Sequence, residues 1–539
     1  MNKTKSLFLW VSIIAACLLI FSPVASTQSD NPKSTLGALP DPCLFPDPPS
    51  YCTPTEIPRD QRKGLVLGPA SVVSRDAIMG DQDLRGPINR TTNLEIVNAT
   101  GTGYVRLWVD MGVLQPSRST TNAIRTTPLT KPLIESLDGQ IIRARQHGLK
   151  IILTVNHNYP TWVVWYRGST RPSGTCDDES NKIREICRRV PEDLDERSPW
   201  GKFVSFLVRE YGFTKGKTDL SQPDYNRYVD FLEIVNEPNL THRTRTKRTS
   251  GGRLVIALNV ADMFETAQKI VRERNADLRD AGKLDAGATT IRLTGPATAD
   301  TLRDGRLTNY QDFTEELLLA LKRRNFAAGA GFVWSQHVYK DMEEQRNCAP
   351  GDEGCARTPH CHDYDTEQRA LKALSKINSV AWVEKRLDDG VGGYRWSDGD
   401  GNPAIFLTEG GVRLDQVVNI YWCYLGLPQP VEPNSPGYAA FAQAVRAKMP
   451  EIKAWQAGLV ESSFNKMSQG RLSKGVLLFT NYLAYTDPSY DTGMFDFTGP
   501  CGPSDNQGDW YDRASEKICT GENGTERPLF RKWKTLRTP

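Results

Sequence analysis

The feature that most constrains the fold is a series of eight short β-rich runs, most of them separated by a helix-like segment. Each run is bounded by turn-forming residues, a pattern that indicates buried strands ending in loops. The runs cover residues 64–70, 103–110, 149–158, 230–238, 289–297, 331–339, 404–411 and 475–483. The helix-like segments cover residues 134–148, 260–275, 310–325, 438–459 and 529–536. Eight strands that alternate with helices predict an α/β fold, the (β/α)8 TIM barrel.

An open, doubly wound sheet is the structural alternative, because alternation of strands and helices does not by itself show that the sheet closes. None of the runs is followed by the glycine-rich loop that holds a nucleotide phosphate. Its absence from the sequence argues against the nucleotide-binding form of this alternative.

The chain has 539 residues, whereas a barrel of this kind typically needs about 250. Long stretches follow the runs that end near Asn156, Tyr339, Gly411 and Tyr482. The segments that follow the strands of a barrel all emerge at its C-terminal face, so we expect long loops around that face. We assign residues 64–539 to the barrel. The proline-rich residues 27–63 are expected to form an N-terminal arm.

The N-terminus has the organisation of a signal peptide. Two lysines precede an apolar run over residues 7–21, and small residues follow it. We expect residues 1–26 to be removed and the mature protein to be exported, without stable insertion in a membrane. A retained anchor helix is one alternative, although the apolar run is slightly short for a bilayer. The sequence Ile-Ala-Ala-Cys at residues 14–17 resembles a lipoprotein cleavage site, so a periplasmic or lipid-anchored protein is another.

Ten of the 11 cysteines lie beyond the expected signal peptide, an even number for an oxidising compartment. Eight of the ten fall in the long stretches after the strands, so we expect disulfides to brace the loops of the C-terminal face. The neighbouring groups are Cys43 and Cys52; Cys176 and Cys187; Cys348, Cys355 and Cys361; and Cys501 and Cys519, while the partner of Cys423 is left open. A metal site formed by Cys355, His360, Cys361 and His362 is the alternative, but their spacing matches no usual zinc finger. We expect no metal and no cofactor.

The composition is that of a soluble globular protein, with 39% hydrophobic residues, 24% charged residues and a mean hydropathy of −0.48. The formal net charge of +3 is close to neutral for this length. It gives no support to nucleic acid as a partner, since that would favour a concentrated basic face. The sequence leaves the oligomeric state open.

Two of the expected strands end in a glutamate that chain-breaking residues follow directly. Glu237 closes the fourth run ahead of Pro238, and Glu409 closes the seventh run ahead of two glycines. Proline cannot donate a hydrogen bond to a sheet ladder, so it ends the fourth strand at this point. In a closed barrel the fourth and seventh tips can face each other across the mouth. Two carboxylates about 5–5.5 Å apart are what retaining glycoside hydrolysis requires.

The sequence LEIVNEPN at residues 232–239 resembles the fourth-strand motif of the clan A (β/α)8 retaining glycoside hydrolases, which include cellulases, mannanases and xylosidases. The resemblance implies that Glu237 is the acid/base and that Glu409 is the nucleophile. It extends over residues 64–539, although only strand ends carry it.

Three other strand-end residues match the same pattern. His337 and Tyr339 resemble the His-x-Tyr motif of the sixth strand, whose tyrosine hydrogen-bonds the nucleophile in that clan. Arg106 resembles the second-strand arginine that lies beneath the nucleophile. The chain departs from the pattern at Tyr482, where the clan usually presents a tryptophan, and at Gly410, where it often has an aromatic residue. These departures concern the identity of the sugar more than the type of reaction.

Chemistry requires the two glutamates to differ in charge. Glu237 has to be protonated near the working pH, which burial and the neighbouring charge of Glu409 favour. Glu409 has to be ionised, and Arg106 together with a hydrogen bond from Tyr339 is expected to keep it so.

Two further residues of the fourth run are given roles. Asn236 is expected to donate a hydrogen bond to the sugar 2-hydroxyl, with a strand-end cap as the alternative. Glu233 lies on the same strand face as Glu237 because side chains alternate along a strand. We expect Glu233 to point into the barrel and to form a structural salt bridge.

Other candidate substrate-binding residues lie in the loops. His157 and Asn158 follow the third run and are candidate sugar contacts, as is His337, with a hydrogen-bonded structural role as the alternative for the histidines. Two groups of loop aromatics are candidate stacking platforms, namely Trp162, Trp165 and Tyr166, and Tyr421, Trp422 and Tyr424. Aromatic residues in long loops also form local loop cores, so both interpretations stay open.

A basic segment follows the fourth run directly, within residues 242–253, and contains Arg243, Arg245, Lys247 and Arg248. A solvated loop is the default explanation, and selection of an acidic sugar by electrostatic focusing is the alternative. Asn239 begins an Asn-Leu-Thr sequence that would accept a glycan in a eukaryotic host, and Asn89, Asn98 and Asn523 begin further sequences of this kind.

These observations predict an exported retaining glycoside hydrolase that cleaves a β-linked oligo- or polysaccharide. The long loops slightly favour endo action. A non-hydrolytic carbohydrate-binding or cell-surface protein on the same barrel is the alternative, and a transglycosylase would use the same residues. The sequence specifies neither the sugar nor the linkage.

Overall fold

The computed structural model describes the chain over a set of separate ranges. These are residues 60–67, 93–117, 123–156, 159–160, 162–163, 191, 194–212, 227–240, 248–282, 290–300, 310–324, 326, 332–343, 385–388, 394–397, 402–403, 405–431, 435–468, 476–482, 491–494 and 526–537. The expected signal peptide, nearly all of the expected N-terminal arm and the alternative metal site lie outside them. Cys423 is the one cysteine inside them, and it is disulfide-bonded. The pairing of the other cysteines stays a prediction.

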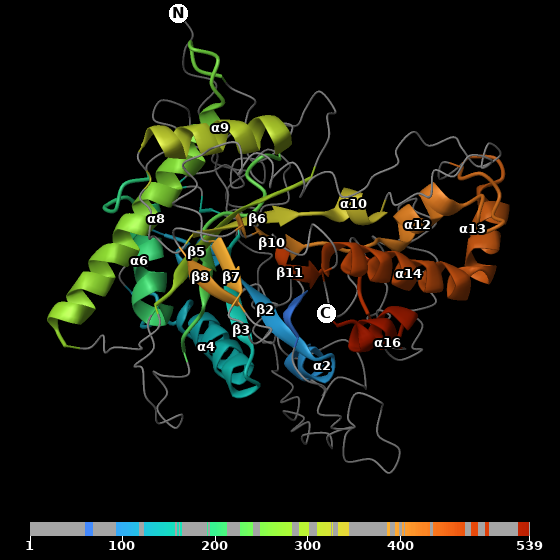
Figure 1. Cartoon of the computed structure of the whole chain (residues 1–539), viewed down its shortest axis with the longest axis horizontal. Helices are drawn as coiled ribbons and strands as arrows, with labels where there is room; N and C mark the ends of the chain where they lie inside the picture. The colour runs from blue at the N-terminus through green and yellow to red at the C-terminus, as the bar shows by residue number, and fades with distance from the viewer. Residues whose placement is uncertain are drawn as a thin grey trace, which may run out of the picture. The chain divides into compact units, whose positions relative to one another are not determined.

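Eight parallel strands close into a barrel in the order β1-β11-β10-β6-β5-β4-β3-β2, and the barrel occupies the centre of Figure 1. The strands are β1 (Asp60–Val66), β2 (Thr102–Val109), β3 (Lys150–Val155), β4 (Phe231–Glu233), β5 (Arg292–Thr298), β6 (Phe332–His337), β10 (Ile405–Glu409) and β11 (Val476–Asn481). Each strand overlaps one of the eight predicted runs. The predicted (β/α)8 barrel is therefore confirmed, and the open sheet is wrong.

The barrel interior changes from apolar to polar along the strands. One buried cluster inside the barrel consists of Tyr104, Ile152, Phe231, Val333, Phe406, Leu477 and Leu478. Two residues further along five of these strands lie the buried polar residues Arg106, Thr154, Glu233, Ser335 and Thr408. Because side chains alternate along a strand, residues two apart face the same side. The interior is thus sealed by an apolar layer and carries polar groups toward the C-terminal ends of its strands, where the candidate residues lie.

Helices cover the outside of the barrel (Figure 1). They include α4 (Lys131–Gln146), α6 (Pro199–Tyr211), α8 (Val255–Asp280), α9 (Tyr310–Arg323) and α16 (Pro528–Thr535). In α4 the buried residues Leu133, Leu137, Ile141 and Ala144 recur every three or four positions, as expected of a helix with one face on a core. The larger apolar cluster of the protein lies between the strands and these helices, and α6 also contacts α8, which contacts α9.

The predicted helix over residues 438–459 is wrong in its extent. Two helices occupy this region, α13 (Tyr438–Ala447) and α14 (Met449–Ser468). Pro450 explains the break, because its ring lacks an N–H and is tolerated only in the first turn of a new helix. The sequence analysis also missed the helices α2 (Asn93–Ala99), α3 (Met111–Leu114), α6, α10 (Tyr339–Glu343) and α12 (Leu414–Tyr421).

Two features lie outside the predicted pattern of strands. Strand β1 begins at Asp60, inside the segment assigned to the N-terminal arm. An antiparallel sheet that was not predicted consists of β7 (Lys385–Asp388), β8 (Tyr394–Ser397) and β9 (Asn402–Pro403), in the order β8-β7-β9. Among the residues that the structure describes, no helix is both long and apolar enough to cross a membrane.

Candidate active site

Glu237 lies in a tight turn directly after the short strand β4. Its backbone is in the left-handed region, with φ of 45°, which is uncommon for a residue other than glycine. Its N–H donates to the carbonyl oxygen of Ala297 at the end of β5, at 3.0 Å. The predicted strand over residues 230–238 is therefore too long, since the ladder stops at Glu233. The turn leaves the Glu237 side chain partly exposed, with 16% of its surface accessible.

Glu409 is the last residue of β10 and reaches the barrel interior through an irregularity in that strand. The register against β6 pairs Leu407 with Gln336 and Glu409 with His337, so β10 has one extra residue. Such a bulge interrupts the alternation of side chains. Thr408 and Glu409 consequently both contact interior residues, as their hydrogen bonds with Glu233 and Arg106 show. Regular alternation would have sent Glu409 outward.

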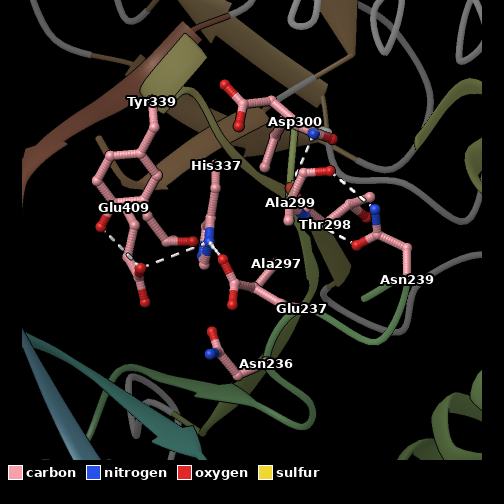
Figure 2. Close-up of polar contacts among 12 residues, drawn as sticks. Asn236, Glu237, Asn239, Ala297, Thr298, Ala299, Asp300, His337, Tyr339 and Glu409 are labelled. Carbon is pink, nitrogen blue, oxygen red and sulfur yellow. Dashed lines mark hydrogen bonds and ion pairs between the residues drawn. The ribbon is translucent and has the colours of Figure 1, made fainter. Parts of the chain in front are cut away.

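The two carboxylates face each other across His337 (Figure 2). One carboxylate oxygen each of Glu237 and Glu409 and one ring nitrogen of His337 all lie within 4.8 Å of one another. Nδ1 of His337 lies 3.0 Å from Oε1 of Glu237 and 3.5 Å from Oε2 of Glu409. His337 is completely buried, and its ring is edge-on to that of Tyr339.

Arg106 lies buried beneath this pair and contacts three of the neighbouring side chains. Its guanidinium forms an ion pair with Oε1 of Glu409 through Nη1. It contacts Oε2 of Glu233 through Nε at 2.8 Å, and Nη2 donates to Oδ1 of Asn236 at 2.9 Å. Burial by itself would lower the pKa of Arg106, but the charges of Glu233 and Glu409 outweigh it and raise that pKa above its usual value.

Glu233 is the buried partner of Arg106, as predicted, and its two carboxylate oxygens are fully occupied. Oε2 accepts from Arg106 and from the hydroxyl of Thr154 at 2.8 Å. Oε1 accepts from Ser335 at 2.7 Å and from Thr408 at 2.9 Å. Burial alone would raise the pKa of Glu233, but Arg106 and the hydroxyl donors outweigh it and lower that pKa. Glu233 therefore stays ionised and fixes the guanidinium beneath Glu409.

Tyr339 makes the hydrogen bond that the sequence motif predicted. Its hydroxyl donates to Oε2 of Glu409 at 3.0 Å. Its ring packs edge-on against Tyr482, with 5.9 Å between the centroids. Tyr482 therefore lies at the site, at the end of β11, and its N–H donates to the carbonyl oxygen of Gly410 at 2.6 Å.

Of the candidate substrate-binding residues in the loop after β3, the structure describes only Trp162. His157, Asn158, Trp165 and Tyr166 lie outside the described residues. Trp162 donates from Nε1 to the carbonyl oxygen of Gln115 at 3.1 Å. It stays a predicted substrate contact.

Tyr421, Trp422 and Tyr424 are best explained as a local loop core. Tyr421 and Tyr424 pack against Trp455 of α14, with ring centroids 5.1 and 6.1 Å away. Trp422 packs against the main apolar cluster.

Arg243, Arg245 and Lys247 of the basic segment lie outside the described residues. Arg248 is exposed, pairs with Leu254 in a short bridge, and donates to the carbonyl oxygen of Gly252 at 2.6 Å. These contacts describe a turn ahead of α8 and leave the choice between neutral and acidic sugars open.

The group of Glu237, His337 and Glu409 also offers oxygen and nitrogen atoms of the kind that bind a divalent metal. A histidine that binds a metal through one nitrogen normally donates from the other to an acceptor. Nε2 of His337 is buried and has no hydrogen-bond acceptor in the described part of the chain. The tautomer with its proton on Nδ1 is therefore favoured, and it donates toward Glu237. The donor set suits proton transfer better than metal binding.

Two residues that were not predicted to belong to the site, Asn239 and Asp300, border it on the β5 side (Figure 2). Both amide atoms of Asn239, which was expected only as a glycan acceptor, are hydrogen-bonded to the backbone of Ala299. Oδ2 of Asp300 accepts from the N–H of Lys340, at the start of α10, at 2.5 Å. Asn239 directly follows the predicted strand over residues 230–238, and Asp300 lies three residues beyond the one over residues 289–297, but nothing in their spacing indicates these partners.

No protein-family model and no curated protein matches the chain. Among solved structures, the chain is similar to a family 5 xyloglucanase from Paenibacillus pabuli, with 10% identity, 85% of this chain and 98% of that chain covered, and a TM-score of 0.38. It is similar to a tri-modular endo-β-1,4-glucanase from Bacillus halodurans, with 12% identity over 89% of this chain and 61% of that chain, and a TM-score of 0.40. A broad specificity endoglucanase from Clostridium acetobutylicum has 10% identity over 88% of this chain and 96% of that chain, and a TM-score of 0.41. At such identities and TM-scores the functional assignment rests on the residues of the site.

Proposed function

We propose that this protein is an exported retaining glycoside hydrolase that cleaves β-linked oligo- or polysaccharides, with Glu409 as nucleophile and Glu237 as acid/base. The observation that carries the proposal is the approach of the two carboxylates, which have oxygens within 4.8 Å of each other. Retaining enzymes place these groups about 5–5.5 Å apart, whereas inverting enzymes leave about 6.5–9.5 Å for a water molecule. The short separation favours direct attack by one carboxylate.

The surroundings of Glu409 suit a nucleophile. Arg106 and the Tyr339 hydroxyl both donate to its carboxylate, which fixes the direction of its lone pairs. In the first step Glu409 attacks the anomeric carbon, and the bond from that carbon to the leaving oxygen breaks. The product is a glycosyl ester of Glu409.

The surroundings of Glu237 suit the acid/base. Its side chain is more exposed than that of Glu409, with 16% against 6% of the surface accessible, and it contacts the His337 ring. With its proton on Nδ1, His337 donates to Oε1 of Glu237, which leaves Oε2 to carry the transferable proton. Glu237 gives this proton to the leaving oxygen. It then removes a proton from the water that hydrolyses the ester.

Asn236 supports the same reaction from the side of the sugar 2-hydroxyl. Because Oδ1 of Asn236 accepts from Arg106, the amide nitrogen points away from Arg106 and is oriented to donate. A hydrogen bond to the 2-hydroxyl strengthens as positive charge develops at the ring.

Export rests on the expected signal peptide, and the slight preference for endo action rests on the long stretches that follow the strands. The competing proposal is a carbohydrate-binding protein without activity. It gives no reason for a buried arginine, a tyrosine and a histidine to be directed at two acidic side chains. Transglycosylation is compatible with the same geometry and differs only in whether water or a sugar attacks the intermediate.

The test is hydrolysis of a panel of β-linked neutral and acidic glycans by the wild type, Glu237→Gln and Glu409→Ala. Activity in the wild type and its loss in both variants is expected. Azide should restore turnover of Glu409→Ala with an inverted glycosyl azide as product. If the wild type binds a glycan of a broad panel but cleaves none, the binding protein is the better proposal. Products longer than the substrate would indicate transglycosylation.

A further inference from the structure

The turn that carries Glu237 is attached to the end of β5 at two points. The first is the hydrogen bond from the Glu237 N–H to the carbonyl oxygen of Ala297, at 3.0 Å. The second lies two residues further along both segments. There Nδ2 of Asn239 donates to the carbonyl oxygen of Ala299 at 2.8 Å, and the N–H of Ala299 donates to Oδ1 of Asn239 at 2.9 Å. Both contacts are drawn beside Glu237 in Figure 2.

The amide of Asn239 replaces the backbone of a paired strand. It satisfies both the backbone donor and the backbone acceptor of one residue, Ala299, as a neighbouring strand would. Asn239 has no solvent-accessible surface, so water cannot take over these bonds if the amide is lost. Strand β4 has already stopped pairing at Glu233, and the side chain of Asn239 continues the attachment beyond that point.

The end of β5 is itself held by β6. The N–H of Ala297 donates to Oγ of Ser335 at 2.9 Å, and Nε2 of Gln336 donates to the carbonyl oxygen of Thr298 at 2.8 Å. The next residue of β6 is His337, whose Nδ1 contacts the Glu237 carboxylate at 3.0 Å. Strand β6 therefore fixes the Glu237 backbone, through the end of β5, and also carries His337, the hydrogen-bond partner of the Glu237 carboxylate.

Glu237 depends on this attachment more than an ordinary loop residue does. Its φ of 45° is a sparsely populated conformation, and so is the φ of 51° at Ala297. Such conformations persist only where surrounding contacts impose them. The Asn239 contact lies two residues beyond Glu237 in the same turn, with Pro238 between them.

We propose that Asn239 is a positioning residue for the acid/base. Its bonds to Ala299 hold the Glu237 carboxylate where it can protonate the leaving oxygen. The inference rests on the proposed function, since it assigns Glu237 the acid/base role. It concerns the acid step specifically. Glu409 is positioned by Arg106 and Tyr339 from the other side of the site and does not depend on this turn.

The same contacts correct the expectation that Asn239 accepts a glycan. Its Nδ2 atom, which would carry the sugar, is buried against Ala299. A glycan on that atom would remove the hydrogen bond and could not fit in the interior. In contrast, Asn98 is exposed.

The experiment compares Asn239→Ala with the wild type on two substrates of the same sugar. One is an oligosaccharide, whose leaving group requires protonation, and the other is a dinitrophenyl glycoside, whose leaving group does not. Glu237→Gln provides the reference for complete loss of the acid. We expect kcat/KM of Asn239→Ala to fall about 100-fold on the oligosaccharide and less than about 5-fold on the dinitrophenyl glycoside, since general acid catalysis contributes about 100- to 10,000-fold. Azide should accelerate turnover of the dinitrophenyl glycoside and give a glycosyl azide of retained configuration.

Gln456→Ala is the matched control. Gln456 is also a completely buried amide, and its Nε2 donates to the backbone carbonyl of Val412 at 2.7 Å, but it lies on α14. Its loss should change kcat/KM on the two substrates by the same factor. If Asn239→Ala does not fold, Asn239→Asp replaces it, since the carboxylate keeps an acceptor for the N–H of Ala299, lacks the donor for its carbonyl oxygen and adds a negative charge there.

If the Asn239 variants lowered kcat/KM by the same factor on both substrates, the positioning role would be overturned, because a merely structural role lowers the two values in parallel. The proposed function itself would be contradicted by a wild type that is inactive on both substrates. It would also be contradicted if Glu237→Gln lowered kcat/KM equally on the oligosaccharide and on the dinitrophenyl glycoside. The positioning role would then fall with it.

Discussion

Arg106 donates two hydrogen bonds to a single oxygen of Glu233, from Nε at 2.8 Å and from Nη2 at 2.5 Å. Neither residue reacts in the proposed mechanism, yet both are buried inside the barrel. The remaining nitrogen of the guanidinium, Nη1, contacts Glu409. The pair with Glu233 therefore fixes the direction from which Nη1 of Arg106 approaches Glu409. The charge of Arg106 is shared between the two glutamates.

Glu233→Gln should destabilise the protein by about 3–5 kcal/mol, because it leaves the buried Arg106 without its main counter-charge. Unfolding by urea, followed by circular dichroism, measures the change. Glu210→Gln is the control, since Glu210 pairs with Arg125 while 24% of its side chain is exposed. That substitution should cost no more than about 1 kcal/mol. Equal losses in the two variants would contradict a structural role for the buried pair.

Tyr339→Phe should lower kcat/KM about 10- to 100-fold, because it removes the hydroxyl that donates to Glu409 and costs one hydrogen bond to a charged group. The ring contacts with His337 and Tyr482 remain, so the melting temperature should change little. Tyr421→Phe removes a comparable buried hydroxyl, which donates to the carbonyl oxygen of Glu343 at 3.0 Å. It should leave kcat/KM unchanged. A Tyr339→Phe variant with wild-type kinetics would show that Arg106 alone orients the nucleophile.

Asp300→Asn should stabilise the protein at neutral pH, because burial, together with the neighbouring Asp341, raises the pKa of Asp300 well above its usual range. The folded protein then binds a proton that the unfolded chain has already released, so wild-type stability falls as the pH rises above about 4. Asparagine keeps an oxygen for the Lys340 N–H and cannot ionise. The stability difference between variant and wild type should grow from pH 4.5 to pH 7, to about 1–3 kcal/mol.

Thermal unfolding of both proteins across this pH range is the measurement. Asp312→Asn, an exposed aspartate in the first turn of α9, serves as the control and should show no such growth. A constant difference between Asp300→Asn and the wild type would mean that Asp300 ionises alike in both states.

The strands were predictable because a buried parallel strand is a short apolar run, and the glycines after Glu409 marked the end of β10. The contacts of Glu409 with Arg106 and Tyr339 were implied by the resemblance of the strand-end motifs to those of the clan A glycoside hydrolases. The burial of Glu233 followed from alternation along the fourth strand. That prediction required only the period of a strand.

Irregular backbone explains what was not predictable. Glu409 points inward only because β10 has an extra residue between Leu407 and Glu409 relative to β6, and no pattern in the sequence marks that bulge. The partner of Asn239 depends on the course of the chain at Ala297 to Ala299, where φ turns positive. Short helices such as α10 depend on packing rather than on a long periodic pattern.

Lys63 is another buried charged residue, and no motif in the sequence predicted its burial. Its Nζ donates to the carbonyl oxygens of Thr100 at 3.0 Å, Trp533 at 2.5 Å and Leu536 at 3.1 Å. Two of these acceptors lie at the end of the C-terminal helix α16. Burial lowers the pKa of Lys63 to about 7; the charge of Arg537 adds to the effect, and Asp60 partly opposes it.

The stability contributed by Lys63 should therefore depend on pH above neutrality. Between about pH 7 and pH 10 the unfolded chain still holds the lysine proton, whereas the folded protein has released it, so stability rises with pH by up to about 1.4 kcal/mol per pH unit. Lys63→Met removes this term, and the difference in unfolding free energy between wild type and variant should shift in favour of the wild type from pH 7 to pH 9.5. Lys202→Met, at an exposed position of α6, should keep a constant difference. Parallel curves for Lys63→Met and the wild type would show that the three carbonyl acceptors keep Lys63 charged in the folded protein.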